Sequence, residues 1–116
     1  MRKYAWLKDP HVTADGMKVW KIMLCTADHG CYLFLYSDPD AVMSSSDLWY
    51  ESPEEVYECW DEFVDEKRWM ELEDPLPYCQ HDAFVPVRVK GRNIGKPEWG
   101  KFEVLRDGSW SEYKPQ

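Results

Sequence analysis

The chain has 116 residues, a length typical of one folded domain. Hydrophobic residues make up 44% of it and aromatic residues 16%, which excludes a disordered chain because so many rings need a core. Its formal net charge of −8 disfavours nucleic acid as the main partner, since a negative field repels phosphates. No run approaches the roughly 18 apolar residues of a membrane-spanning helix, so no membrane partner is expected.

The charge is concentrated in the middle of the chain. Residues 38–82 hold 15 acids and two bases, a net charge of −13, whereas residues 1–37 and 83–116 carry +2 and +3. An acidic block of this kind attracts basic surfaces. No apolar signal segment follows Met1, so we expect a reduced, cytoplasmic protein whose four cysteines are free thiols.

The first third of the chain predicts three strands. Residues 4–8 form a short strand that Asp9-Pro10 ends, which leaves His11 in a loop. Residues 17–25 and 31–37 have large apolar side chains at both odd and even positions, the pattern of central strands buried on both faces. The loop between them has hairpin length and ends at Gly30.

Residues 52–66 give the clearest helix pattern. Ser52 is a preferred N-cap, Pro53 suits the first helical position, and Glu55 completes a capping box. The apolar residues share one side of this helix: Val56, Tyr57, Cys59, Trp60, Phe63 and Val64. The acids share the other side, here named the acidic helix face: Glu54, Glu55, Glu58, Asp61, Glu62, Asp65 and Glu66. We expect a helix over residues 53–66 that buries its apolar side, with Cys59 as a buried thiol.

The last third predicts a sheet edge and a hairpin. Residues 67–82 lack periodicity and predict an irregular segment around the core, while residues 83–89 alternate and carry Pro86, which favours a sheet edge. Asp107-Gly108 is the strongest hairpin signal in the chain. A two-residue turn there pairs Leu105 with Trp110.

The same hairpin turn also sets Glu103 opposite Glu112, a disfavoured pair of like charges. The repulsion could be relieved by fraying of the strand end in water, by a slip of the register or by a nearby cation. Fraying is the favoured interpretation.

Together these elements predict an α+β fold in a single domain over residues 1–116. Its mainly antiparallel sheet has about five or six strands, with one amphipathic helix packed on one face. The size, acidity and element pattern are similar to those of small bacterial immunity or inhibitor proteins, an analogy of composition that involves no motif.

The acidic helix face is the leading candidate for a functional surface. Its carboxylates cluster beyond what solubility needs, which makes docking of a basic protein partner the leading functional hypothesis. A solvated face that keeps a small protein soluble is the simpler and favoured interpretation. The contact residues expected are Glu55, Glu58, Asp61, Glu62 and Asp65. The protein is expected to be a monomer or a homodimer, because the basic loop of one copy has the charge to meet the acidic helix of another.

Basic and aromatic residues within residues 88–102 form the second candidate. Arg88, Arg92, Lys96 and Trp99 combine the charge that binds phosphate with a ring that stacks on a base. A ligand-binding or nucleic-acid-binding module is therefore the alternative function. A solvated basic loop is the simpler interpretation.

Thiols and imidazoles form the third candidate. Cys25, His29 and Cys31 bracket one loop, and Cys79 and His81 lie close together in another. Their spacing matches no standard zinc motif, so core cysteines are the favoured interpretation and no metal or other cofactor is expected. No catalytic motif occurs, and a small enzyme with a His/Cys/acid site at residues 79–82 is the least favoured function.

Five aromatic residues fall outside the expected elements: Trp49, Tyr50, Trp69, Tyr78 and Trp99. Rings in loops are common anchors of binding surfaces. Rings that close the core beneath long loops are the favoured interpretation.

Overall fold

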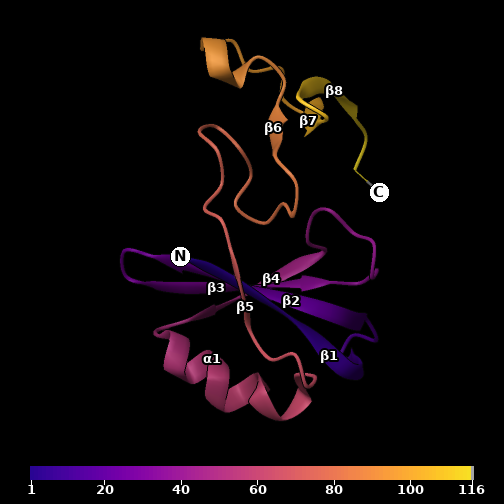
Figure 1. Cartoon of the computed structure of the whole chain (residues 1–116), viewed down its shortest axis with the longest axis vertical. Helices are drawn as coiled ribbons and strands as arrows, with labels where there is room; N and C mark the ends of the chain where they lie inside the picture. Colours follow the sequence, from indigo (N-terminus) through magenta and orange to yellow (C-terminus); the bar gives the residue numbers. More distant parts are fainter. Residues whose placement is uncertain (116) are drawn as a thin grey trace. The chain divides into compact units, whose positions relative to one another are not determined.

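The chain has two compact units, residues 1–74 (unit 1) and residues 75–116 (unit 2), in a computed structural model that describes residues 1–115. Unit 1 contains a five-stranded antiparallel sheet in the order β4-β3-β2-β1-β5, and unit 2 contains a three-stranded antiparallel sheet in the order β6-β7-β8 (Figure 1). The mainly antiparallel α+β fold with one amphipathic helix is confirmed, with its strands divided between two sheets. That both units form one domain stays a prediction.

Five strands build the sheet of unit 1: β1 (Arg2–Val12), β2 (Lys18–Ala27), β3 (Gly30–Tyr36), β4 (Ser46–Tyr50) and β5 (Met70–Leu72). The expected central position of β2 is confirmed, since every residue from Lys21 to Cys25 is buried. The expected end of the first strand at Pro10 was wrong. The pairing of β1 with β2 shifts register between Trp6 and His11, and this bulge accommodates a proline, which lacks a ladder donor. His11 therefore lies in a strand and not in a loop.

Two short strands lie outside the segments predicted as strands. β4 begins at Ser46, within a stretch expected to be a polar connector, and β5 lies within the expected irregular segment. Strand β5 pairs with the first half of β1, from Arg2↔Leu72 to Tyr4↔Met70. Three residues are too few to show the alternation from which a strand is recognised in sequence.

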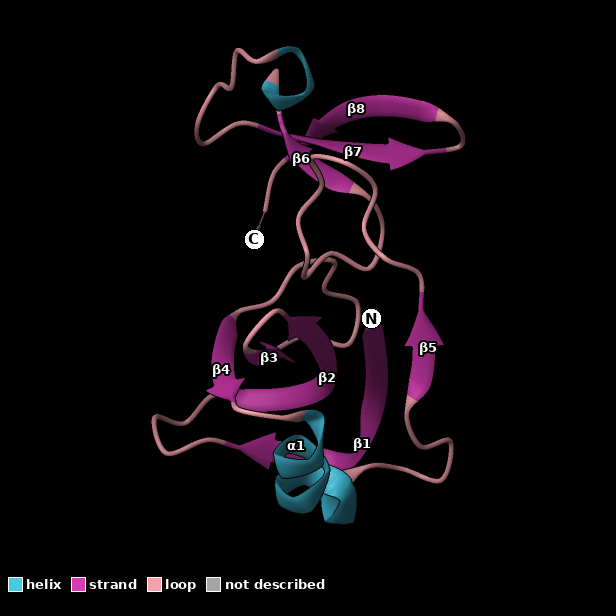
Figure 2. Ribbon diagram, turned by 90° about the vertical axis from the view of Figure 1, so that its left-hand side faces the viewer, coloured by secondary structure: helices cyan, strands magenta, loops and turns pink. Residues whose placement is uncertain are grey.

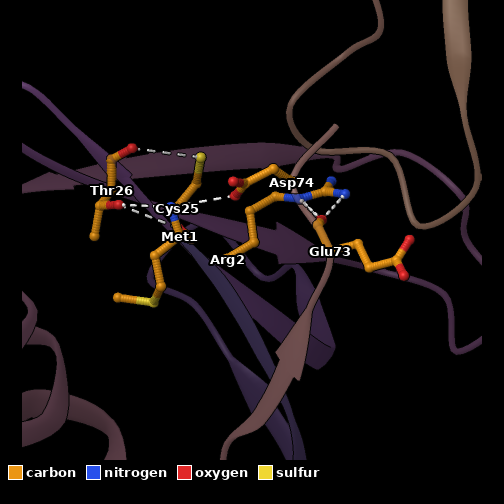
Figure 3. A network of polar contacts seen from close by, with 6 residues as sticks. All are labelled: Met1, Arg2, Cys25, Thr26, Glu73 and Asp74. Carbon is orange, nitrogen blue, oxygen red and sulfur yellow. Dashed lines mark hydrogen bonds and ion pairs between the residues drawn. The ribbon is translucent and has the colours of Figure 1, made fainter. Parts of the chain in front are cut away.

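The Arg2 side chain and the amino group of Met1 hold the residues that follow β5 (Figure 3). Arg2 is buried and donates from Nε to the carbonyl oxygen of Glu73 at 2.8 Å. The amino group of Met1 donates to Thr26 Oγ1 at 3.1 Å and lies 3.3 Å from a carboxylate oxygen of Asp74. The last residues of unit 1 are thus held to the first.

The helix α1 spans Pro53–Trp60 and continues as a 3-10 turn over Asp61–Phe63. Its N-cap is confirmed, because the Glu55 amide donates to Ser52 Oγ at 3.4 Å. It ends earlier than expected because Val64 turns back into an extended conformation and forms a β-bridge with Leu7. The last turn also lacks a basic residue that would favour the helix dipole there.

One face of the five-stranded sheet packs against α1 (Figure 2). Val56, Trp60 and Val64 are buried in a core that also contains Ala5, Leu7, Val19, Ile22, Leu24, Cys31, Leu33 and Leu35. Burial of large apolar side chains contributes about 1.5–3 kcal/mol each. This outweighs the few tenths of a kcal/mol by which each pair of like charges on the acidic helix face repels.

The opposite face of that sheet is aromatic and contains a buried lysine. The register places Trp6 and Tyr36 beside Lys21, whose Nζ lies 5.3 Å and 5.4 Å from the centres of their rings. Lys21 Nζ also donates to the carbonyl oxygens of Pro39 and Ala41 at 3.0 Å and 2.8 Å. It therefore fastens the segment that follows β3 to this face.

Unit 2 contains β6 (Val87–Val89), a 3-10 turn (Arg92–Ile94), β7 (Phe102–Arg106) and β8 (Ser109–Tyr113). The expected sheet edge after Pro86 and the hairpin at Asp107-Gly108 are both confirmed, and both turn residues have positive φ.

The expected register of this hairpin is also confirmed, with Glu103 opposite Glu112. The prediction that a frayed strand end relieves the repulsion between these two carboxylates was wrong. Arg88 Nε lies 3.3 Å from Glu103 Oε1, so a cation compensates the like charges.

Candidate functional site

The acidic helix face is oriented by the buried side of α1. Trp60 is 7% exposed, and its indole Nε1 donates to the hydroxyl of Tyr50 at 3.0 Å. Val56 lies one turn before it and is fully buried. With this side fixed against the sheet, residues on the other side of the helix face solvent.

Glu58 and Glu62 are the most available carboxylates on the acidic helix face. Both are exposed, and within residues 1–115 the carboxylate of neither takes part in a hydrogen bond or an ion pair. Glu54 and Glu66, the outermost acids of the face, are also exposed. These four carboxylates are free to contact a partner.

The other acids of the face have contacts within the fold. Asp61 Oδ1 accepts a hydrogen bond from Trp69 Nε1 at 2.8 Å and lies 3.4 Å from Arg68 Nη2. A carboxylate oxygen of Asp65 accepts from the Lys67 amide at 3.0 Å.

Glu55 is partly engaged as well. Its Oε2 accepts from the Glu51 amide at 3.2 Å, which completes the cap of α1. The five predicted contact residues therefore divide into two that are free, Glu58 and Glu62, and three with internal contacts.

Cys59 is exposed, contrary to the prediction of a buried thiol. It lies at the boundary of the apolar side of α1, between the buried residues Val56 and Trp60 and the acidic helix face. The core is completed by Val64 beyond the end of the helix, so the buried stripe is narrower than the expected one.

The basic residues of the second candidate are only partly available. Arg88 belongs to β6, pairs with Glu103 and stacks on the ring of Trp110, with its guanidinium carbon 3.7 Å from the ring centre. Arg92 donates from Nη1 to the carbonyl oxygen of Tyr78 at 3.3 Å. Lys96 is exposed and, in the described chain, has no such contact.

Residues 90–101 form a loop closed by its own backbone. The Lys96 amide donates to the Gly91 carbonyl at 3.0 Å and the Glu98 amide donates to the Lys90 carbonyl at 2.8 Å. A Cβ on Gly91 would lie 2.2 Å from the Lys96 carbonyl oxygen, so only glycine fits there. The loop presents Trp99 with 76% of its surface exposed. Trp99 and Lys96, both exposed and three residues apart on this loop, are the part of the second candidate that remains available to a ligand.

A small pocket of about 250 Å³ lies in unit 2, next to this loop. It is lined by Lys90, Lys101, Phe102, Glu103 and Glu112. Lys90 and Lys101 also lie 3.9 Å and 3.4 Å from the carboxylate of Glu98. The mixed charge of the lining suits a small polar molecule better than a polyanion.

The thiols and imidazoles provide little for catalysis or metal binding. Cys25, Cys31 and Cys79 are buried, whereas His29 and His81 are exposed. Burial, followed by the charges of Glu55, Cys25 and Glu54, raises the pKa of the Cys31 thiol and so disfavours the reactive thiolate. In residues 1–115, no group of three or more His, Cys, Asp or Glu side chains is placed to hold a metal ion.

Trp49, for which closure of the core beneath a loop was the favoured interpretation, is instead an exposed ring on a strand of unit 1. Trp49 lies in β4, is 49% exposed, and contacts the ring of Tyr32 on β3 edge-on, with ring centres 4.8 Å apart. Of the other rings predicted to lie in loops, Trp99 and Tyr78 are exposed, and Tyr50 and Trp69 are half-buried. The alternation of Asp47, Trp49 and their neighbours could have signalled this strand, but five residues gave too weak a pattern.

Comparisons with known proteins identify no relative: no family model, no curated protein and no solved structure matches the chain. The longest helix among the described residues, α1, has eight residues, whereas about 20 are needed to cross a membrane.

Proposed function

We propose that this protein is a non-enzymatic interaction protein that binds a basic protein partner through the acidic helix face, in the manner of an inhibitor or immunity protein. The observation that carries the proposal is the geometry of α1. Its apolar side is buried through Val56 and Trp60, which leaves Glu58 and Glu62 exposed and without internal contacts.

The charge of unit 1 supports this choice of partner. Unit 1 contains 17 acids and seven bases, a net charge of −10, while unit 2 has a net charge of +2. Residues 22–66 contain 12 acids and no lysine or arginine. Within residues 1–115, Asp61 is the one acid of the acidic helix face that forms an ion pair, with Arg68. The field of the other acids accelerates the approach of a basic surface in a salt-dependent manner.

Glu58 and Glu62 form the centre of this interface, with Glu54 and Glu66 at its rim. Asp61 and Asp65 support the surface from within, because their carboxylates already accept hydrogen bonds from residues that follow the helix. An exposed ion pair contributes about 0.2–1 kcal/mol, and charge reversal turns that attraction into repulsion. Reversal at both central positions should therefore weaken binding by about 1–3 kcal/mol, or roughly tenfold to a hundredfold.

The test is affinity capture with the wild type and with a Glu58→Lys/Glu62→Lys double variant. A partner recovered by the wild type is identified, purified, and titrated against both proteins at low and physiological salt. We expect the double variant to bind at least tenfold more weakly, with a smaller dependence on salt.

An Asp9→Lys/Asp28→Lys double variant is the matched control. It changes the net charge of unit 1 by the same amount at exposed acids outside the helix. It should retain the partner. Equal binding by the wild type and the Glu58→Lys/Glu62→Lys variant would refute the proposal.

Single-stranded nucleic acid is the second candidate ligand, supported by the exposed Trp99 and Lys96 on one loop that is closed by hydrogen bonds. A fluorescent oligonucleotide should bind at about 50 mM salt and lose affinity steeply as salt is added. Trp99→Ala should abolish this binding. No binding at low salt would remove this candidate.

A further inference from the structure

Strand β4 is an edge strand with little of the usual protection, since Asp47 is its one charged residue. It pairs with β3 from Leu35↔Ser46 to Cys31↔Tyr50, and no strand among the described residues pairs with its other side (Figure 2). Protein edge strands are commonly blocked by proline, lysine, a bulge or very short length. β4 contains no proline or lysine, its pairing is continuous, and four of its five residues are exposed.

The opposite edge of the same sheet is protected. β5 has only three residues and is followed by Glu73, whose carbonyl is bound by Arg2. The sheet is therefore open to a further strand on one side only, beside β4.

Trp49 provides a fixed apolar anchor on this edge. Its six-membered ring lies over Gly30, where an added Cβ would come within 2.3 Å of Trp49 Cζ2. The ring of Trp49 also makes an edge-on contact with the ring of Tyr32. Tyr32 in turn stacks on Phe34, with ring centres 5.8 Å apart. A half-exposed ring that is already fixed loses little conformational freedom when a partner covers it.

The charge around β4 indicates the sign of the partner. Asp47 shares a face of the strand with Trp49, and Glu51, Glu54 and Glu55 follow the strand directly. A second copy of the chain would place these acids against their own counterparts, which is unfavourable. A segment with lysine or arginine side chains complements them.

We propose that β4 accepts an extended basic segment of a partner protein as a sixth strand of this sheet. The main chain of the segment bonds to the outer edge of β4, an apolar side chain packs on Trp49, and basic side chains reach Asp47 and Glu51. This surface is built on β4 and includes Glu54 and Glu55 at the start of the acidic helix face. It shares with the proposed function these two acids and the sign of the partner's charge.

The first test uses a capped peptide, acetyl-Thr-Lys-Thr-Val-Thr-Lys-Thr-amide, titrated into the full chain and followed by amide NMR. Its valine and two lysines lie on one face of an extended strand, as Asp47, Trp49 and Glu51 require. We expect shifts confined to β4 and its surroundings, and slower hydrogen exchange of outward-facing amides within residues 46–50. A peptide with Glu in place of Lys should not bind. The amides of alternate residues of the peptide face β4, so of two peptides N-methylated at one or the other alternate set, one should bind at least tenfold more weakly, because each lost main-chain bond costs about 1 kcal/mol.

Absence of binding by the lysine peptide, or binding that N-methylation leaves unchanged, would overturn the proposal. Binding without main-chain bonds would show that the peptide is held by charge alone. Formation of a dimer by the free protein that is lost on substitution of Trp49 would show that a second copy occupies β4, and would also overturn it.

Two pairs of variants locate the binding. Trp49→Ala should weaken binding of the peptide by about tenfold or more. Trp99→Ala, which removes an exposed ring of unit 2, should leave this binding unchanged. Asp47→Lys should weaken it, while Asp9→Lys should not. Peptide binding that survives Glu58→Lys/Glu62→Lys supports β4 independently of the helix, so the two proposals fail separately.

Discussion

Trp60 is the residue on which the orientation of the acidic helix face depends. Its ring is 7% exposed, belongs to the core between α1 and the sheet, and contacts the rings of His11 and Phe63, with centres 5.2 Å and 6.0 Å away. Truncation of a buried tryptophan to alanine typically costs about 3–5 kcal/mol. Because a domain of this size is stable by about 5–15 kcal/mol, Trp60→Ala should remove a large share of the stability of unit 1.

The hydrogen bond of the indole is separable from the packing of the ring. Tyr50→Phe leaves the buried Nε1 of Trp60 without its acceptor, which should cost about 1–3 kcal/mol. Trp60→Phe removes the donor together with part of the ring. A double-mutant cycle of the two substitutions should give a coupling energy of about 0.5–1.5 kcal/mol.

The assay is urea unfolding followed by circular dichroism, with amide hydrogen exchange in β2 to assign the loss to unit 1. Trp99→Ala is the control, since its exposed ring should contribute within about 0.5 kcal/mol. A cost below about 1 kcal/mol for Trp60→Ala would mean that the helix is not anchored by its buried side. The outward position of Glu58 and Glu62 would then lose its physical basis.

Two further substitutions test the sheet of unit 1. Gly30→Ala places a Cβ 2.3 Å from Trp49 Cζ2 and 2.7 Å from the Tyr50 carbonyl oxygen, so it should cost about 1–3 kcal/mol and shift the amide signals of β4; unchanged signals would contradict the described position of the ring. Burial lowers the pKa of Lys21, against the smaller opposing effect of Asp40 and Asp38, so the folded protein loses this proton at a lower pH than the unfolded chain does. Between these two pH values the unfolded chain binds more protons, and the stability of the wild type should rise relative to Lys21→Met as pH increases toward the ordinary lysine pKa of about 10.4. Urea unfolding of both proteins from about pH 8 to 10 measures this difference, and a difference that stays constant with pH would refute it.

Local signals in the sequence predicted the elements that depend on local chemistry. Ser52 and Pro53 gave the start of α1, and Asp107-Gly108 gave the hairpin with its register, because capping and turn geometry are decided within a few residues. Strand β5 and the bulge in β1 depend on contacts between distant segments. No pattern in three residues, or around Pro10, contains that information.

The candidate site was predictable to the same extent. The helical period correctly gave an acidic side, but it could not separate Glu58 from Asp61, because the distinction depends on where the chain returns after the helix. Arg68 and Trp69 fold back onto Asp61 and leave Glu58 and Glu62 untouched. Likewise, Trp49 is an exposed anchor only because Gly30, on the neighbouring strand, leaves space for its ring.

The hydrogen bond from Arg2 to the Glu73 carbonyl affects how unit 1 responds to force. β5 is the last element before the chain leaves unit 1, and its three ladder pairs alone would peel away easily under tension. Because the buried guanidinium of Arg2 is bonded to the carbonyl of Glu73, directly after β5, a pull on the following residues is transmitted to β1, which is bonded on both sides. A force applied through the residues after β5 would therefore act on β1, inside the sheet of unit 1, before it separates β5 from the edge of that sheet.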